Sequence, residues 1–389
     1  MPDLLLKNLE IDNFRTFGHL EIDKLGRVNL ITGKNNVGKS SLLEALWLYA
    51  RGGGVEALRD SLIYRNEVAT QERFSSRDRS VISALPGDYD ELIDSVKYLF
   101  HDYHKTSFPP PPIYVGPVKL AKGTKPVATH ASIKIEIGWY IVQEVDDELT
   151  TPRRYVKLDA KQVPLHEDAD LYFVVGNGKR RVRFKVDRIF SRNSSSTSLD
   201  EIRSNFVKTE GLNARETSSL WNEIQLTDSE KSVLEAVRLI APDVERISVR
   251  SGEQSELRKP IPIIRLKGQD DPVPLRVLGD GINRLFGLTL ALTNTKGGIL
   301  LVDEIENGLH YSVFLELWRF LFAVATQFNV QVFATTHSLD CVRSFQKAAK
   351  ESEEEGFLIR LKDSHGVVSA TTLTKEELAL ATRDHVEVR

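Results

Sequence analysis

The chain has 389 residues, of which 41% are hydrophobic and 28% are charged, and its formal net charge is −3 at pH 7. This length provides for one large domain or two of ordinary size, and the composition differs clearly from that of disordered chains. The small negative charge excludes a basic coat over the whole molecule, although it says nothing about a local basic surface.

Two strands and a helix are expected in residues 1–52. Leu4 to Phe14 combines apolar runs with alternation, and Arg27 to Thr32 is a short apolar stretch that leads directly into Gly33. Leucines at helical spacing follow Ser40, and Gly52-Gly53-Gly54 is expected to end that helix. The order strand, glycine-rich loop, helix is the context that a phosphate-binding loop requires.

Residues 53–190 are predicted to be mostly β. Alternation from Ala131 to Glu144 predicts a strand, and apolar runs on both sides of Gly176-Asn177-Gly178 predict a hairpin. A serine-rich linker begins at residue 191, and the following residues up to Pro242 are predicted to be a short helical arm. Thr227 and Glu230 are expected to form a capping box at the start of its last helix.

Strands and helices alternate in residues 243–389, which predicts an α/β layer with parallel strands. The expected elements are strands at Arg246 to Val249 and Pro262 to Leu266, a helix at Ile282 to Leu292, a strand at Ile299 to Val302, a helix at Tyr311 to Thr326 and a strand at Val330 to Thr335.

Cys341 is the single cysteine, so no disulfide can form within the chain, and its helical context predicts a buried structural thiol. No apolar run reaches the ~18 residues that a bilayer-spanning helix needs. The N-terminus lacks the pattern of a signal peptide. We therefore expect a cytoplasmic protein with no membrane partner.

The segment from Gly33 to Ser40 matches the phosphate-binding pattern G-x-x-x-x-G-K-[ST] in full. The backbone N–H groups of such a loop form an anion site to which the following helix contributes its dipole. Lys39 is expected to reach the β- and γ-phosphates, and the Ser40 hydroxyl to bind Mg²⁺. The sequence thus predicts binding of ATP and Mg²⁺, with a nucleotide-binding set of Gly33, Asn35, Asn36, Gly38, Lys39, Ser40 and Ser41.

Two later strands carry polar residues at their ends. The apolar strand from Ile299 ends in Asp303 and Glu304, and the strand from Val330 ends before His337. Both groups should lie at the carboxyl edge of one sheet, where ligands bind in open α/β folds. We expect Asp303 to hold the metal, Glu304 to polarise the attacking water, and His337 to contact the γ-phosphate.

Two further features are weaker in isolation. The turn Gly279-Asp280-Gly281 opens a helix that includes Asn283 and Arg284, so it predicts an anion site or a plain turn. Arg181, Arg183 and Lys185 share one strand face, which either contacts a nucleic-acid backbone or is simply solvated. No aromatic residue alternates with them to stack on bases.

Four of these features are the P-loop, the strand ending in Asp303 and Glu304, the strand ending before His337, and the Gly279 turn. In their order and spacing they resemble the ATP-binding-cassette ATPases of the RecF, SMC and OLD type, and most closely the bacterial AAA-family ATPases related to OLD proteins. Ile11 to Phe17 resembles their opening strand, Asp303 to His310 their Walker B motif and D-loop, and Thr336-His337-Ser338 their switch histidine. The resemblance is specific over residues 1–50 and 275–345 and loose between them.

The resemblance implies an α/β P-loop NTPase with an ABC-ATPase head: residues 1–52 and 243–389 form the head, 53–190 a β-rich insertion and 191–242 the arm. It also implies a head-to-tail dimer in which ATP lies between one P-loop and the partner's signature turn, Gly279, Asp280, Gly281, Asn283 and Arg284. Gly279 stands where the family has a serine, so one γ-phosphate contact would be lost. Gln143 is the candidate for the family's glutamine loop.

OLD proteins carry a C-terminal TOPRIM nuclease domain, for which the ~45 residues after Ser344 are too few. The acidic residues from Glu351 to Glu355 are expected to be solvated. The chain therefore resembles the ATPase subunits of split anti-phage systems such as PARIS, in which a separate nuclease or TOPRIM-like effector is controlled. The alternatives are a DNA-repair or DNA-maintenance ATPase, and a scaffold that binds ATP with little turnover.

Overall fold

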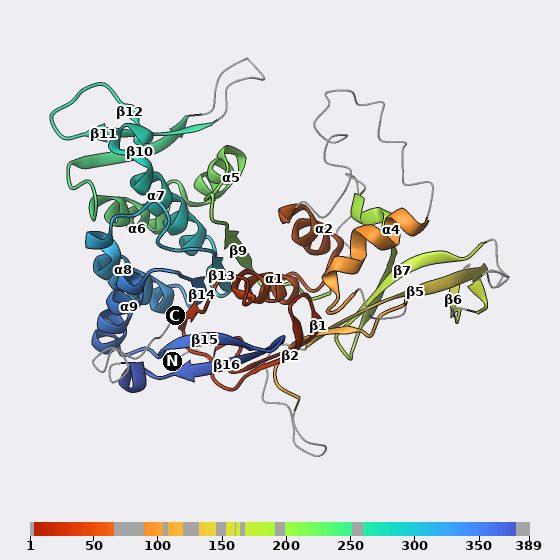
Figure 1. The fold of residues 1–389 in the computed structure, drawn as a ribbon. Coiled ribbons are helices and arrows are strands. Elements are labelled where there is room, and N and C mark those ends of the chain that lie inside the picture. The colour runs from red at the N-terminus through yellow and green to blue at the C-terminus, as the bar shows by residue number, and fades with distance from the viewer. Residues whose placement is uncertain are drawn as a thin grey trace.

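The computed structural model describes residues 4–65, 89–103, 108–119, 132–144, 153–159, 161–163, 168–190, 199–250 and 260–378, and the following account concerns these residues. The serine run 191–198 lies outside them. Two β-sheets with a helix between them organise the molecule, and further helices cover the free face of one sheet (Figure 1).

A six-stranded sheet with the order β16-β15-β3-β14-β13-β9 contains the strand that leads to the P-loop. All neighbours in it pair in parallel except the edge strand β16. The central strands are buried along their whole length, which explains their nearly continuous apolar sequences. The strands are β3 (Val28–Thr32), β9 (Ser204–Val207), β13 (Ile299–Val302), β14 (Gln331–Thr335), β15 (Gly356–Ser364) and β16 (Val367–Leu373).

Strand β9 corrects one prediction. Its four residues lie within the segment 191–242, for which we predicted only helices, yet β9 pairs in parallel with β13 at the sheet edge. The prediction missed it because the Ser-Asn-Phe-Val sequence is short and partly polar, as an incompletely covered edge strand can be. The segment therefore contributes to the core sheet as well as to helices.

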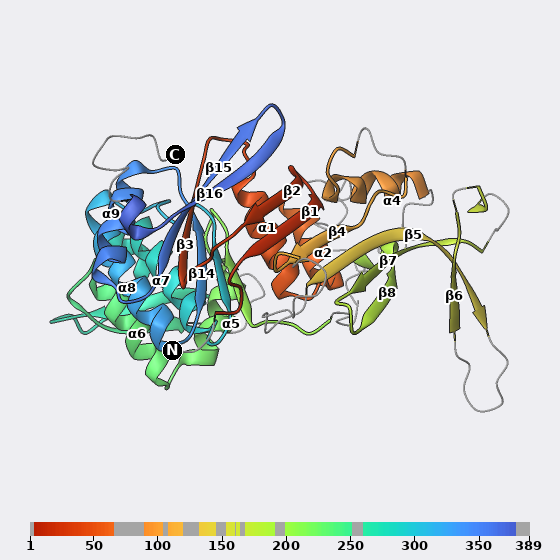
Figure 2. The same cartoon turned by 90° about the horizontal axis from the view of Figure 1, so that it is seen from below.

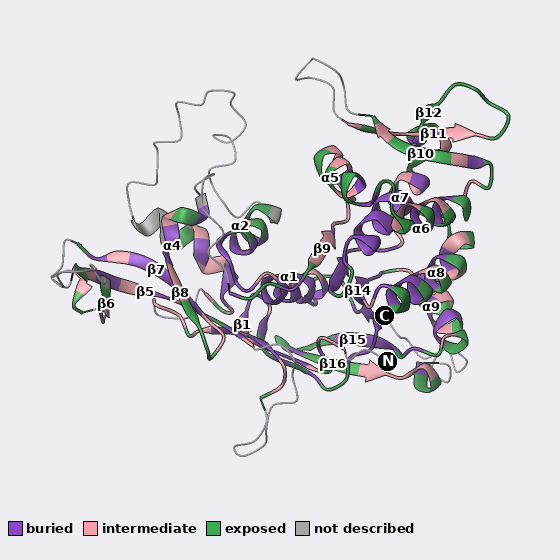
Figure 3. Ribbon diagram, turned by 180° about the vertical axis from the view of Figure 1, so that it is seen from behind, coloured by how far each residue is buried: buried purple, intermediate pink, exposed green. Residues whose placement is uncertain are grey.

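Helices cover both faces of this sheet. Helix α1 (Lys39–Ala50) lies on one face and shares a core with Ile31, Leu301 and Phe333. On the other face, α7 (Asp280–Thr293), α8 (Phe314–Gln327) and α9 (Leu339–Glu351) pack around Trp318 and the opposite side chains of the same strands. Figure 3 shows α1 and the central strands as the most deeply buried part of the fold. This packing fixes the start of α1 relative to the ends of β13 and β14.

A seven-stranded antiparallel sheet lies on the other side of α1 and extends away from the core sheet (Figure 2). It has the order β2-β1-β4-β5-β7-β8, and β6 pairs with β5. Its inner face packs on α1, α2 (Val55–Tyr64) and the segment of α4 (Tyr89–Val96) and η1 (Lys97–Leu99). Its strands are β1 (Leu9–Phe14), β2 (Phe17–Ile22), β4 (Ile113–Gly116), β5 (Ile133–Glu144), β6 (Arg153–Lys157), β7 (Asp170–Gly176) and β8 (Arg181–Lys185). The expected β-rich subdomain is therefore present, and β1 and β2 from the N-terminus complete its sheet.

A smaller unit packs against α7. Helices α5 (Ala214–Ile224) and α6 (Asp228–Arg238) share a core with a three-stranded sheet, β10 (Val244–Arg250), β11 (Ile261–Leu266) and β12 (Val273–Pro274). The expectation that these strands join the parallel layer is wrong, because β10, β11 and β12 pair only antiparallel, as a separate sheet. Short 3₁₀ turns complete the chain: η3 (Val186–Phe190), η4 (Leu275–Leu278) and η5 (Tyr311–Val313).

Two local predictions concerned Cys341 and the start of α6. Cys341 is fully buried, as expected, and burial raises the pKa of its thiol to about 12. The Thr227 hydroxyl caps α6, but the Glu230 carboxylate accepts from the N–H of Leu226 instead of closing the expected box. The box occurs one helix earlier, at Asn213 and Glu216 of α5.

The acidic segment after α9 is not uniformly solvated. Glu354 is 9% exposed, and its carboxylate lies 3.6 Å from Nε of the buried Arg27. Glu354 thus pairs with Arg27, the residue just before β3, whereas the run of acidic residues had predicted only solvated side chains. None of the helices in the described part of the chain combines the length and apolar character needed to cross a membrane.

Candidate functional site

The P-loop connects β3 to α1 and requires glycine at two positions. Gly33 has φ +146, and a Cβ there would lie 2.6 Å from the Leu361 carbonyl oxygen. Gly38 has φ +104, and a Cβ there would lie 2.5 Å from the Thr16 hydroxyl. Both the left-handed backbone and the close neighbours exclude a side chain. The loop is therefore held as a tight backbone cradle at the start of a 12-residue helix.

Lys39 lies inside this cradle. Its Nζ donates to the carbonyl oxygens of Gly33 at 2.7 Å and Lys34 at 2.9 Å. Burial lowers the pKa of Lys39, and the nearby carboxylates of Asp303, Glu304 and Glu306 oppose that shift. The ammonium group is thus buried among oxygens that phosphate oxygens can replace.

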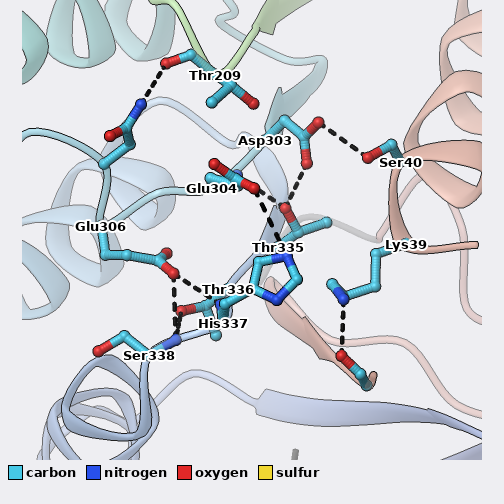
Figure 4. A network of polar contacts seen from close by, with 12 residues as sticks. Lys39, Ser40, Thr209, Asp303, Glu304, Glu306, Thr335, Thr336, His337 and Ser338 are labelled. Carbon is cyan, nitrogen blue, oxygen red and sulfur yellow. Dashed lines mark hydrogen bonds and ion pairs between the residues drawn. The ribbon is translucent and has the colours of Figure 1, made fainter. Parts of the chain in front are cut away.

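Ser40 and Asp303 meet across the interface between α1 and the core sheet. The Ser40 hydroxyl donates to Oδ2 of Asp303 at 3.0 Å, and the other carboxylate oxygen, Oδ1, accepts from the Thr335 hydroxyl at 2.5 Å (Figure 4). The same Thr335 oxygen accepts from the backbone N–H of Glu304 at 2.8 Å. Thr335 therefore orients both acidic residues of the strand end, a role that we did not predict.

The structure brings Glu304 and His337 together, as the predicted adjacency of their strands requires. His337 Nε2 lies 3.5 Å from Oε1 of Glu304, and both side chains are more than one-third exposed. Glu304 has φ +47, a strained backbone conformation for a non-glycine residue. Glu306 Oε1 accepts from the N–H groups of His337 and Ser338, at 2.7 and 3.1 Å, and so fixes the loop that carries the histidine.

An open pocket of about 950 Å³ lies between these groups. Its lining residues are Thr16, Asn35, Asn36, Gly38, Lys39, Ser40, Ser41, Arg65, Glu304, Glu306, Asn307 and His337. Most of the predicted nucleotide-binding residues thus face one space, together with both predicted catalytic residues. Thr16, Arg65, Glu306 and Asn307 were not predicted to belong to this site.

The donor set fits ATP and Mg²⁺. A hydroxyl and a carboxylate converge at Ser40 and Asp303, and such hard oxygen ligands are those that Mg²⁺ prefers. The glycine cradle and the buried ammonium of Lys39 fit the phosphates. We expect the metal to neutralise charge on the phosphates, while Lys39 binds them and Glu304 orients water.

Arg284 differs from the prediction. Its side chain is buried, at 8% exposed, and it donates to the backbone oxygens of Asp303 at 2.7 Å, Glu304 at 3.2 Å and Lys208. Burial lowers the pKa of its guanidinium. This use within its own subunit argues against the predicted trans role of Arg284, which stays a prediction.

The rest of the predicted signature turn lies at the surface. Gly279 and Asp280 are exposed, Gly279 has φ +102, and the Asn283 amide donates to the Gly279 oxygen at 3.4 Å. A Cβ on Gly281 would lie 2.7 Å from the Gly308 oxygen, so the turn packs closely on the segment after the acidic pair. None of these turn residues lines the described nucleotide pocket of the same chain.

The remaining predicted residues lie elsewhere. Gln143 is exposed on β5, where it pairs with Arg154 of β6, and it does not line the described nucleotide pocket, so its assignment to a glutamine loop is wrong. Arg181 is exposed on β8. The Arg183 guanidinium lies 5.3 Å from the ring centroid of Tyr155, and Lys185 forms an ion pair with Asp170.

A phosphate cradle, a buried lysine and an oriented acidic pair on adjacent parallel strands together define a P-loop NTPase, so the predicted fold class is confirmed. A family model described as "AAA domain" matches residues 8–236, and one described as "AAA domain, putative AbiEii toxin, Type IV TA system" matches residues 177–341. The chain belongs to this AAA-domain family and is an ATPase.

Individual proteins resemble this chain either at low sequence identity or over a short segment. A Helicobacter pylori protein named ATP/GTP phosphatase is 22% identical over 369 residues, which cover 90% of each chain. The DNA replication and repair protein RecF of Clostridium acetobutylicum is 41% identical over 49 residues, 13% of this chain and 14% of RecF. Among solved structures, the SMC head domain of Thermotoga maritima has a TM-score of 0.44 at 15% identity, covering 95% of this chain and 99% of that one.

Proposed function

We propose that this ATPase is a Mg²⁺-dependent switch in which two copies close head to tail around ATP and control a separate effector protein. The observation that carries the proposal is the Ser40–Asp303–Thr335–Glu304 network, which joins the P-loop to the acidic pair and leaves Glu304 and His337 facing an open pocket. Because that pocket is open, a second copy is proposed to complete it.

The exposed turn at Gly279 supports this dimer. It begins the 14-residue helix α7, whose first N–H groups form an anion site. We propose that Gly279, Asp280, Gly281 and Asn283 contact the γ-phosphate in the partner, mainly through backbone amides. Without a serine hydroxyl at Gly279, ATP is expected to close the dimer less firmly.

The test compares two variants of the ATPase site with a control variant in the same P-loop. Lys39→Ala should lose ATP binding, whereas Glu304→Gln should bind ATP, hydrolyse it at least ~100-fold more slowly and accumulate as a dimer. Lys34→Ala, at an exposed position of the same loop, serves as the control. Light scattering with ATP and a phosphate-release assay give the two readouts. Equal turnover in wild type and Glu304→Gln would reject the role of Glu304.

The effector role is proposed for anti-phage defence in the cytoplasm. Support comes from the matching family description, which names a putative AbiEii toxin and a type IV TA system. A nuclease or TOPRIM-like protein that copurifies with Glu304→Gln in ATP, and not with Lys39→Ala, is the expected result. Loss of phage protection in Lys39→Ala would be the cellular counterpart, and unchanged protection would contradict the proposal.

DNA maintenance is the second candidate, favoured by the outer face of the antiparallel sheet. Strand register places Lys134, Lys157, Arg181, Arg183 and Lys185 on this face, where Glu136, Glu144 and Asp170 are the acidic positions among the described residues of β5 to β8. Alternate residues of β8 follow one another at about 6.6 Å, a regular row of cations that suits a phosphate backbone.

Aromatic residues are present on this face, although none of them alternates with the cations along β8 itself. They come from neighbouring strands: Tyr155 and Tyr172 have ring centroids 5.5 Å apart, and Arg183 lies over Tyr155. A double Arg181→Glu, Arg183→Glu variant should abolish any stimulation of ATP turnover by DNA and reduce the salt slope of binding by about 2. Lys362→Glu on the exposed part of β15 is the control, and an unchanged slope in the double variant would eliminate this candidate.

A further inference from the structure

A second pocket, of about 240 Å³, lies between α1, α2, β9 and α5. It shares no lining residue with the nucleotide pocket. Trp47, Phe206 and Leu220 supply apolar surface, and Asp60 and Lys208 are among its charged residues. The pocket is small enough that only a compact group, or the end of a side chain, can enter it.

Asp60 is the pocket carboxylate to which no described residue donates a hydrogen bond. Glu44 forms an ion pair with Arg15 at 2.5 Å and accepts a hydrogen bond from Arg65 at 2.7 Å, and Glu216 accepts from the N–H of Asn213 at 2.8 Å. Asp60, in contrast, accepts no hydrogen bond within the described chain, although water reaches it through the pocket.

Asp60 is an exposed residue that also lines the pocket. Partial desolvation of its carboxylate raises its pKa, although Lys208 and Arg59 attract the charged form. A carboxylate in a partly desolvated place gains most from a ligand that brings both positive charge and N–H donors.

The aromatic wall indicates the shape of that ligand. The rings of Trp47 and Phe206 lie with centroids 6.1 Å apart, and the Arg51 guanidinium is 5.5 Å from the Trp47 ring centroid. The wall therefore already accepts one planar cation. A guanidinium stacks on aromatic surface and can also donate two parallel hydrogen bonds to a carboxylate, which an ammonium group cannot do.

We propose that this pocket binds a guanidinium group, which Asp60 holds through paired hydrogen bonds against the wall of Trp47 and Phe206. The group can belong to a free small molecule or to an arginine side chain of another protein. Both sources present the same chemistry to the pocket, and the experiment separates them.

The walls of the pocket are connected to both halves of the ATPase site. Glu44 and Trp47 belong to the helix that begins with Lys39 and Ser40. On the opposite wall, the Lys208 oxygen accepts from Arg284, which also holds the Asp303 oxygen. Occupation of the pocket should therefore change ATP turnover; this effect rests on the proposed function, whereas binding itself does not.

Binding is tested by calorimetry on the full chain with four probes: ethylguanidine, butylamine, the peptide Gly-Arg-Gly and the peptide Gly-Lys-Gly. We expect saturable binding of a guanidinium probe, at least tenfold tighter than its ammonium match. Asp60→Asn should weaken it at least tenfold, and Trp47→Leu should weaken it independently. Glu223→Gln is the control, because Glu223 is exposed on α5, does not line the pocket and pairs with Arg203.

The outcomes are decisive in each arm. Binding of ethylguanidine assigns the pocket to a free small molecule, and binding of the arginine peptide alone assigns it to a partner's side chain. No binding of either, equal binding of the ammonium probes, or full binding by a folded Asp60→Asn overturns the proposal. ATP turnover of the wild type, measured without probe, shows separately whether the proposed function itself fails.

Discussion

Replacing Arg284 with alanine should destabilise the protein even when no nucleotide is present. The guanidinium connects the loop after β9 to the end of β13, since it bonds to the backbone oxygens of Lys208, Asp303 and Glu304. Removing it takes one donor from each of three carbonyl oxygens at the point where the acidic pair begins, although the Lys208 and Glu304 oxygens keep the N–H groups of Gly211 and Asn307.

The size of the effect follows from these contacts. Hydrogen bonds to a charged group contribute roughly 1.5–3 kcal/mol each. Part of this sum is offset by the cost of burying the guanidinium, so we expect a net loss of about 3 kcal/mol. That is a large share of the roughly 5–15 kcal/mol by which a typical domain is stable.

The assay is urea unfolding of the nucleotide-free protein, with ATP turnover measured on the same preparations. Arg284→Lys should recover little of the stability, because an ammonium cannot span three acceptors in this planar arrangement. Arg276→Ala is the matched control, since Arg276 is an exposed arginine just before α7. Unchanged stability of nucleotide-free Arg284→Ala, with loss only of ATP-dependent dimerisation, would refute the reasoning and restore the trans role.

Three further results are expected. Thr335→Val keeps the side-chain shape but removes the hydroxyl that orients Asp303. Mg²⁺-dependent ATP turnover should therefore fall about 10- to 100-fold in a phosphate-release assay. Unchanged turnover would contradict this role of Thr335. Glu354→Gln should lower the free energy of unfolding by about 2 kcal/mol by weakening its buried pair with Arg27, whereas the exposed Glu353→Gln should not. Because burial lowers the pKa of Lys39, ATP affinity measured by fluorescence should begin to fall below the ordinary lysine pKa of about 10.4 as pH rises; affinity constant up to that value would count against the shift.

Local features of the fold could be predicted from the sequence with good accuracy. The strand, loop and helix around Gly33 are encoded by neighbouring residues, and Ile299–Val302 is a strand with the predicted bounds. Such elements depend on glycine geometry and apolar periodicity, which need no knowledge of distant partners.

Features that depend on distant contacts were predicted less well. Strand β9 is defined by its pairing with β13, almost 100 residues later, and its own sequence gives little signal. The contacts of Arg284 likewise depend on where the ends of β9 and β13 lie. Thr335 could have been found, because a parallel register that pairs Val302 with Ala334 places it beside Asp303.

The position of β3 has a consequence for synthesis of the protein. In the described sheet, β3 pairs only with β14 and β15. Val28 therefore cannot pair until Val332 of the same chain has been synthesised. At roughly 5–20 residues per second, the ~300 intervening residues take about 15–60 s to translate. During that time the P-loop has no sheet to support it and no acidic pair opposite Ser40. A growing chain should therefore be unable to use ATP until its last third has left the ribosome.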